Sequence, residues 1–448
     1  MISFEGVLKE ESSMNMIRGG LRLSTVTGLM LGLAAASSVY AVDGGLARHE
    51  GLPDDQAVSI KPIEDLIMHP QLPERQGVDI GPLNVHASVV AGVEYESNVF
   101  LQETGEQSDL IYVVNPSVGA EVTPGDLNVS LDYDVSINRF SDFDQEDHTD
   151  HEIRGLMVLN MTDIKPSLSG VYRRTDDRIG VEDVNRVELR TTYTRLGVAT
   201  REESFDQLQA EAGYTLGVVD YRSDEVIFSG PSGILTYEDR DRILHVGDAQ
   251  VEYAVSSSLG VLLEFYGGRI EYDSSGVADA WYIQPLTGVS YDIDEDMELE
   301  LKAGYRYQDY EEATVIQTED FSGFVVQGDV RYLLTEDDIV TGTLERNVYE
   351  STFSNQNYFA NRAGLAYTHI FDEKLMGTLF GTYQFNSYPS ATTVDGLSIE
   401  REDDFYGAGS VVRYFIRDWL STQVRYEYRE RDSNVPGLDY TDHIVAVY

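Results

Sequence analysis

The sequence contains no cysteine, few basic residues and no long apolar run, and each absence excludes a class of protein. Without cysteine, the 448-residue chain forms no disulfide framework and no metal–thiolate site, and it has no cysteine nucleophile. Only 32 Lys and Arg stand against 78 Asp and Glu, which gives a formal net charge of -46 at pH 7. Nucleic acid is therefore disfavoured as a partner, because nucleic-acid binding requires a basic surface.

Residues 1–41 have the features of a secretory signal peptide. Arg18 and Arg22 precede an apolar run over 25–36, and Val39 and Ala41 place small residues where signal peptidase cleaves. We predict cleavage after Ala41. After it, no segment approaches the ~18 consecutive apolar residues that a membrane helix needs. If the mature chain spans a membrane, it does so as a β-barrel.

Residues 42–84 are predicted to form a periplasmic N-terminal extension. Five prolines interrupt any long helix or strand there, namely Pro53, Pro62, Pro70, Pro73 and Pro82. Both a linker and a disordered segment fit this composition.

From residue 85 to residue 448, apolar and polar residues alternate, as they do in strands with two different faces. Between Leu127 and Asn138, six apolar positions alternate with six polar ones without exception. Residues 207–218, 297–308 and 420–429 show the same pattern. Marking every such segment predicts eighteen strands, near 85–97, 109–122, 127–139, 151–161, 164–174, 187–200, 205–219, 242–255, 259–272, 281–291, 297–309, 321–333, 339–350, 357–370, 375–387, 403–415, 419–429 and 440–448.

The connections between these segments alternate in length. Tight turns at 124–126, 162–163, 256–258, 294–296, 336–338 and 372–374 alternate with longer connections at 98–108, 140–150, 175–186, 220–241, 310–320, 388–402 and 430–439. Outer-membrane barrels have short periplasmic turns and long extracellular loops. A soluble sandwich or propeller is disfavoured, because its strands are usually ~5–6 residues long. We predict an all-β, transmembrane, antiparallel up-and-down barrel of about eighteen strands in the outer membrane of a Gram-negative bacterium.

If the apolar face meets lipid, the opposite face lines a lumen, which in a barrel of this size is wide enough for an aqueous channel. The predicted lumen-lining residues are Asp132, Asp134, Glu298, Glu300, Lys302, Arg306, Arg425, Glu427 and Arg429. They either contact the solute or pair across strands and rigidify the wall. Leu131 and Leu301 should face lipid, so Arg at either position should cost more than Arg at Ser130 or Gly304.

No catalytic motif is present. The eight histidines are scattered, and the sequence contains no Gly-x-Ser-x-Gly, no His-Glu-x-x-His and no phosphate-binding glycine loop. The acidic segment 142–151, with His148 and His151, could hold a divalent ion, but acidic outer loops are more often only solvated. We predict no enzymatic activity, no cofactor and no metal site.

The last nine residues, Tyr440–Tyr448, are predicted to form the closing strand. Tyr448, Ala446, Ile444 and Tyr440 share one face of this segment. An aromatic residue at the C-terminus is common in outer-membrane barrels, where the final strand pairs with the first and removes both sheet edges. Tyr448 is therefore the expected barrel-closing aromatic, although an ordinary edge strand would show the same local pattern.

The start of the predicted barrel resembles a known family. Gly81-Pro82-Leu83, followed by Ala-Gly-Val-Glu-Tyr-Glu-Ser-Asn-Val-Phe over 91–100, resembles the beginning of the putative β-barrel porin 2 family of bacterial outer-membrane proteins. Tyr95, Asn98, Val99 and Phe100 are the most specific part of this motif. Over about residues 77–448 the resemblance rests more on strand pattern, and it implies no catalytic residue.

The resemblance implies a porin-type conduit. Members of this family are often found among exopolysaccharide or capsule synthesis proteins, which implies that the conduit exports a polymer. Export of an exopolysaccharide is thus the most specific function expected, and a general diffusion porin or a structural or adhesive barrel without transport are the alternatives. Expected partners are outer-membrane lipid and lipopolysaccharide, the barrel-assembly machinery, periplasmic polysaccharide-export components, and a polysaccharide or small solutes. The acidic balance fits a neutral or cationic polymer better than a polyanion.

We predict that the protein fractionates with outer membranes and that its gel mobility depends on heating, because closed barrels resist unfolding in detergent. Membrane fractionation and electrophoresis of heated and unheated samples measure both properties. A soluble periplasmic protein without a heat-dependent mobility shift would contradict the barrel.

Overall fold

The computed structural model describes residues 77–176, 186–201, 207–230, 233–293, 296–315, 320–351, 357–389, 392–394 and 397–448. The predicted signal peptide and most of the predicted N-terminal extension lie outside these residues. Within them, no helix is long and apolar enough to cross a membrane.

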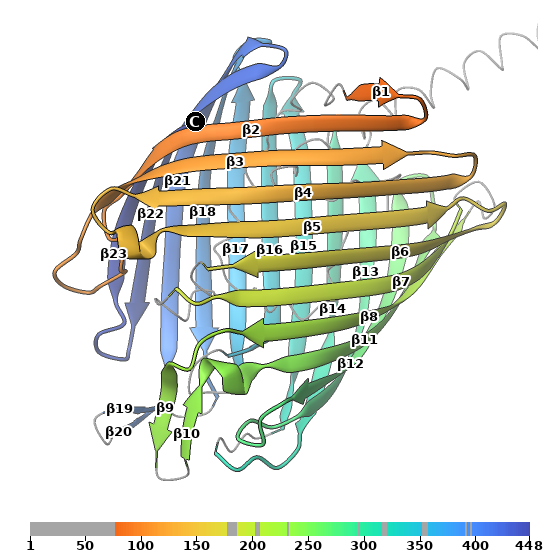
Figure 1. Cartoon of the computed structure of the whole chain (residues 1–448). Helices are drawn as coiled ribbons and strands as arrows, with labels where there is room; N and C mark the ends of the chain where they lie inside the picture. The colour runs from red at the N-terminus through yellow and green to blue at the C-terminus, as the bar shows by residue number, and fades with distance from the viewer. Residues whose placement is uncertain are drawn as a thin grey trace, which may run out of the picture.

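Eighteen long strands of the described chain form one closed antiparallel barrel (Figure 1), which confirms the predicted fold class. Each strand pairs with its neighbours in the chain, and the last pairs with the first. The barrel strands are β2 (Leu83–Glu96), β3 (Asp109–Val122), β4 (Leu127–Phe140), β5 (His148–Leu159), β6 (Ile164–Thr175), β7 (Leu189–Thr200), β8 (Leu208–Tyr221), β11 (Arg242–Ala254), β12 (Leu259–Tyr272), β13 (Ala280–Ile293), β14 (Met297–Tyr310), β15 (Phe321–Thr335), β16 (Asp338–Glu350), β17 (Asn357–Ile370), β18 (Leu375–Ser387), β21 (Glu402–Arg417), β22 (Leu420–Ser433) and β23 (Tyr440–Val447).

Short strands and 3-10 helices lie at the two ends of the barrel. The extra strand β1 (Val78–Ile80) pairs with the start of β2. The 3-10 helices η1 (Asp144–Glu146) and η3 (Tyr237–Arg240) and the hairpins β9 (Val226–Gly230)–β10 (Gly233–Thr236) and β19 (Thr392–Val394)–β20 (Leu397–Ile399) lie in the long connections. Both hairpins lie at the end opposite β1 (Figure 1). We call this end extracellular, because outer-membrane barrels place their long loops outside.

The barrel closes along a short seam. Strand β23 pairs with β2 from Val93, opposite Val447, to Glu96, opposite Ile444. Because β3 pairs with the other edge of β2 along its whole length, β1 and β23 share one edge of β2. The C-terminus consequently lies partway along β2 (Figure 1).

The two faces of the wall differ as the alternation predicts. On β14, Leu301 is 43% exposed, whereas its neighbour Lys302 is 2% exposed. On β4, Leu131 is 55% exposed and Asp132 is 5% exposed. The apolar set therefore covers the outside, and the polar set belongs to the inner wall.

Replacing Leu131 with Arg should destabilise the inserted barrel by roughly 2–4 kcal/mol, because it places a charge against lipid. Ser130→Arg is the matched control, because its side chain belongs to the inner face. Urea denaturation in lipid vesicles measures both variants, and equal losses of stability would contradict the assignment of the two faces or the fold itself.

Gly304 does not serve as a second control. A Cβ atom there would lie 2.0 Å from the Pro285 carbonyl oxygen and 2.9 Å from the Cα atom of Leu286. The expectation that Arg is tolerated at Gly304 is therefore wrong, because backbone atoms cannot move aside as a side chain can.

Candidate functional site

The charged residues predicted on β4 lie in polar contacts on the inner wall. The Asp132 carboxylate is 3.2 Å from His86 Nε2 of β2. This contact crosses β3 at Gly119, where a Cβ atom would lie 2.2 Å from His86 Nε2. Glycine is needed at this position because any side chain would separate the pair. Asp134 accepts a hydrogen bond from Arg154 of β5 at 2.6 Å, and Arg154 also binds Glu152 at 2.8 Å.

The predicted residues of β14 form a second group. Lys302 Nζ lies 2.9 Å from Glu264 of β12 and 3.0 Å from Glu300. Arg306 donates two hydrogen bonds to Gln308 Oε1, at 3.0 and 2.6 Å, and its guanidinium lies 4.1 Å from the centre of the Tyr282 ring. Glu298 lies near the edge of the wall, 3.7 Å from Arg331.

The predicted residues of β22 form a third, separate group. Glu427 is 1% exposed and accepts hydrogen bonds from both Arg425 and Arg429. The structure therefore joins Glu300 with Lys302, and Arg425 with Glu427 and Arg429, but it does not gather all nine residues into one site. Whether they contact a solute stays a prediction.

Sequence alternation alone did not identify a similar group on β7, β8 and β11. Arg195 lies 2.8 Å from Glu211 and 2.5 Å from Asp248. Its guanidinium passes over Gly213, where a Cβ atom would lie 2.2 Å from Nη1. The inward position of each residue is visible in the sequence, but their contact depends on the register of three strands.

Buried arginine–aromatic stacks were also missed. The guanidinium of Arg362 lies 4.4 Å from the Tyr349 ring centre, and that of Arg401 lies 4.4 Å from the Tyr388 ring centre. Tyr358 is packed between Tyr349 and Tyr388, with ring centres 5.7 and 5.2 Å away. These rings stiffen the inner wall at the extracellular end.

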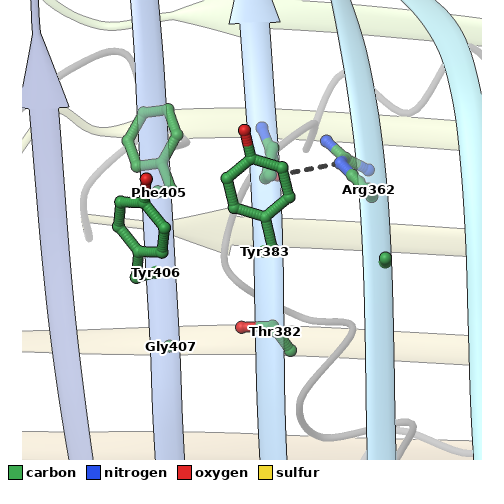
Figure 2. A pocket seen from close by; sticks show the side chains of 8 residues that line it. Arg362, Thr382, Tyr383, Phe405, Tyr406 and Gly407 are labelled. Carbon is green, nitrogen blue, oxygen red and sulfur yellow. Dashed lines mark hydrogen bonds between the residues drawn. The ribbon is translucent and has the colours of Figure 1, made fainter.

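The cavity in the wall beside these stacks is too small for a ligand. Figure 2 shows Arg362, Tyr383 and Tyr406 on three neighbouring strands, with Arg362 Nε donating to Gln384 Oε1 at 2.9 Å. The cavity between them measures ≈ 10 Å³. This is about the space that one water molecule occupies.

Long connections pack into the extracellular end of the barrel. Leu235 and Tyr237, between β8 and β11, are each 1% exposed and belong to an apolar cluster with Tyr221, Leu244 and other wall residues. The cluster also contains residues of the two connections that follow β12 and β14, Val277, Ala278, Ala313 and Val315. Leu235 and Tyr237 of this connection thus fold against the inner wall.

Asp241 ties this connection to the wall electrostatically. Its Oδ1 atom accepts a hydrogen bond from the Tyr221 backbone N–H at 2.6 Å. Burial raises the pKa of the Asp241 carboxyl to about 6, the nearby carboxylates of Asp220 and Asp273 add to this rise, and the Tyr221 N–H opposes it. The carboxyl accordingly changes charge near neutral pH.

The motif at the start of the barrel locks the closing seam. Asn98 is 1% exposed, and its Nδ2 atom donates to the carbonyl oxygens of Gln102 and Thr441 at 2.8 and 3.0 Å. Its backbone N–H donates to Asp442 Oδ1 at 3.0 Å, so it binds β23 twice.

The other motif residues surround this lock. Val99 is 1% exposed, and the Phe100 ring meets Phe143 edge to face, with centres 5.0 Å apart. Tyr95 is 40% exposed on the outer face. Tyr448 faces inward and donates its hydroxyl hydrogen to Glu94 Oε2 at 2.9 Å.

Comparison with known proteins gives one family and several distant structures. The sequence model of the family described as "Putative beta-barrel porin 2" matches residues 72–448. Among solved structures, Pseudomonas aeruginosa OpdK with vanillate is 14% identical, with a TM-score of 0.46, covering 81% of this chain and 97% of that chain. Acinetobacter baumannii OccAB4 is 11% identical, with a TM-score of 0.47, covering 84% and 98%. No curated protein matches the chain.

Replacing Asn98 with Ala should destabilise the barrel by roughly 2–4 kcal/mol, because it removes the three partly buried hydrogen bonds of the Asn98 side chain at about 0.5–1.5 kcal/mol each. Gln102→Ala is the control, since the Gln102 side chain is exposed and its backbone alone binds Asn98. The temperature at which the gel mobility shifts measures the effect. If both variants shift equally, Asn98 does not lock the seam.

Proposed function

Because the chain belongs to the putative beta-barrel porin 2 family, with a match over residues 72–448, we propose that this outer-membrane porin-like channel passes small hydrophilic solutes and prefers cations. One observation supports the preference for cations. On the inner wall, a single Lys or Arg side chain lies between two carboxylates. Lys302 lies between Glu264 and Glu300, and Arg195 lies between Glu211 and Asp248.

Each of these groups has a net negative charge. An acidic wall attracts cations and repels anions, and the surrounding low-dielectric barrel strengthens its field. Exposed carboxylates in the long connections, such as Glu103, Glu106 and Glu311, add to this field at the extracellular end. Arg425 and Arg429 both contact Glu427, so Arg425 offers a contrasting site at which mutation removes a positive charge.

Small solutes fit the extracellular end better than an extended polymer does. Three connections pack together there around Leu235, Val277 and Val315. Inward aromatic rings such as Tyr282 and Phe405 are each 3% exposed, so they do not offer stacking surfaces to a sugar chain.

Export of an exopolysaccharide is the more specific hypothesis for the same conduit, and its support is the association of the family with polymer-synthesis proteins. It requires the packed connections to move. A strain that lacks the gene separates the two proposals. Loss of extracellular polymer would favour export, whereas unchanged polymer with reduced uptake of small cations would favour diffusion.

We expect single-channel recordings in a salt gradient to give a reversal potential whose sign indicates a preference for cations. Glu300→Ala should lower this preference because it removes a negative charge from the inner wall, and Arg425→Ala should raise it because it removes a positive charge. Thr194→Ala, on the exposed outer face, is the control and should change nothing. Anion preference would contradict the proposed selectivity, and absent conductance would favour a structural or adhesive barrel.

A further inference from the structure

Strands β15 and β16 are paired over only part of their described length. The last pair toward the extracellular end joins Val326 and Arg346, yet β15 continues to Phe321 and β16 continues to Glu350. In this stretch β15 remains paired with β14, and β16 remains paired with β17. The wall is therefore split between β15 and β16 near the extracellular end.

The described end of the β16–β17 hairpin, Asn347–Glu350 with Asn357–Ala360, lies inside the barrel, and we call these residues the tip. Glu350 and Asn357 are cross-strand partners at this tip, and both bind the Tyr310 hydroxyl of β14, at 3.1 and 2.7 Å. Glu350 also accepts hydrogen bonds from Gln308 at 2.7 Å and from Tyr272 of β12 at 3.1 Å. These three partners belong to the inner faces of β12 and β14, so the tip reaches past the edge of β15.

The alternation along β16 shows that the tip has bent. Leu344, Val348 and Glu350 occupy the same face of the strand, and Leu344 is 51% exposed on the outside. Val348, in contrast, is 4% exposed in the interior apolar cluster that contains Tyr310 and Phe321. The outer face of the tip thus lies against the inner face of the neighbouring wall.

Aromatic and cationic groups fill the split. The Phe359 ring of β17 meets the Phe321 ring of β15 edge to face at 4.5 Å, and the Arg346 guanidinium lies 4.9 Å from the Phe359 ring centre. Arg346 Nε also donates to the Phe324 carbonyl oxygen at 3.2 Å. This bond occupies a carbonyl oxygen at the edge of β15. A backbone N–H of β16 could bind the same oxygen if the pairing of β15 with β16 continued.

The existing register extends into a fully paired arrangement. From Leu333 to Val326 the β15–β16 pairing has no irregularity, and its continuation places Val325 opposite Asn347 and Gly323 opposite Tyr349. Glycine opposite tyrosine leaves room for the large ring on the inner face. The backbone groups along this edge would then gain the partners that strand edges lack.

We propose that the β16–β17 tip is a gate of the channel, a role that rests on the proposed channel function. In the bent position the tip narrows the extracellular end. In the second position it swings outward, pairs with Phe321–Val325 of β15 and widens the lumen. The exchange trades side-chain hydrogen bonds of Glu350 and Asn357 for backbone hydrogen bonds, so neither position leaves the hairpin without partners.

Cysteine cross-links test the gate directly, because the chain contains no cysteine of its own. The extended β15–β16 register places Phe324 opposite Val348, yet Phe324 is 70% exposed on the outside while Val348 lies in the interior cluster. Phe324→Cys with Val348→Cys therefore forms a disulfide only when the tip pairs with β15. Gln308→Cys with Glu350→Cys, joined by a short bifunctional methanethiosulfonate, holds the tip inside. Asp329→Cys with Thr343→Cys links a pair that is already formed and serves as the control. Heat-dependent gel mobility verifies that each variant is folded.

We expect oxidation of the first pair to raise single-channel conductance at least twofold over the same variant when reduced. Bridging the second pair should hold conductance at or below its reduced level, and the control link should leave it unchanged. Glu350→Ala should raise conductance without any cross-link, because it removes the hydrogen bonds of the tip to Tyr272 and Gln308 and, of these contacts, leaves only that of Asn357 to Tyr310.

The gate is refuted if the control pair oxidises while the first pair does not, or if both linked positions conduct equally. The proposed channel function fails separately. If the unmodified protein and every variant lack both conductance and solute flux, the barrel is not a channel, whereas the cross-linking yields still decide whether the tip takes two positions.

Discussion

The completeness of the backbone hydrogen-bond ladder is the constraint on which the rest of this structure depends. Inside a membrane each backbone N–H and C=O needs a partner within the protein, so a sheet stands there only if it closes on itself. In this barrel the closing contact between β2 and β23 is short. Asn98 and Asp442 extend it with side-chain bonds at its extracellular end. The motif that carries the family resemblance therefore has a structural role, because it lies where the ladder most needs support.

Much of this architecture was predictable because its determinants are local. A period of two specifies strands and their faces from neighbouring residues alone, so the eighteen barrel strands and the exposure of Leu131 and Leu301 follow from the sequence. Charge pairing across strands, such as that of Arg195 with Asp248, depends on register and on glycines that let long side chains lie flat. Register is a property of strand pairs and therefore could not be derived from single segments.

The bent hairpin tip marks the limit of the alternation rule. Val348 and Glu350 have the correct period for an outward face, so their sequence predicts exposure, yet both contact the interior. Alternation assigns residues to one of two faces of a strand, but it does not say where the strand itself lies. The failure at Gly304 has the same origin, since the alternation shows an inward position while the backbone of β13 determines the space available there.

The rigidity of the inner wall and the proposed cation preference depend on the same residues. The two roles that the sequence left open for the wall charges are therefore compatible. A buried cation is costly unless a carboxylate neutralises it. Lys302 meets this need through Glu264, whose side chain is 2% exposed, while the second carboxylate, Glu300, is 21% exposed on the same wall. Around Arg154 the more exposed carboxylate is Asp134, 30% exposed, while Glu152, 16% exposed, is shared with Arg173. In each group the less exposed carboxylate neutralises a buried cation and so stabilises the wall. The other keeps its charge in contact with water, as the proposed cation preference requires.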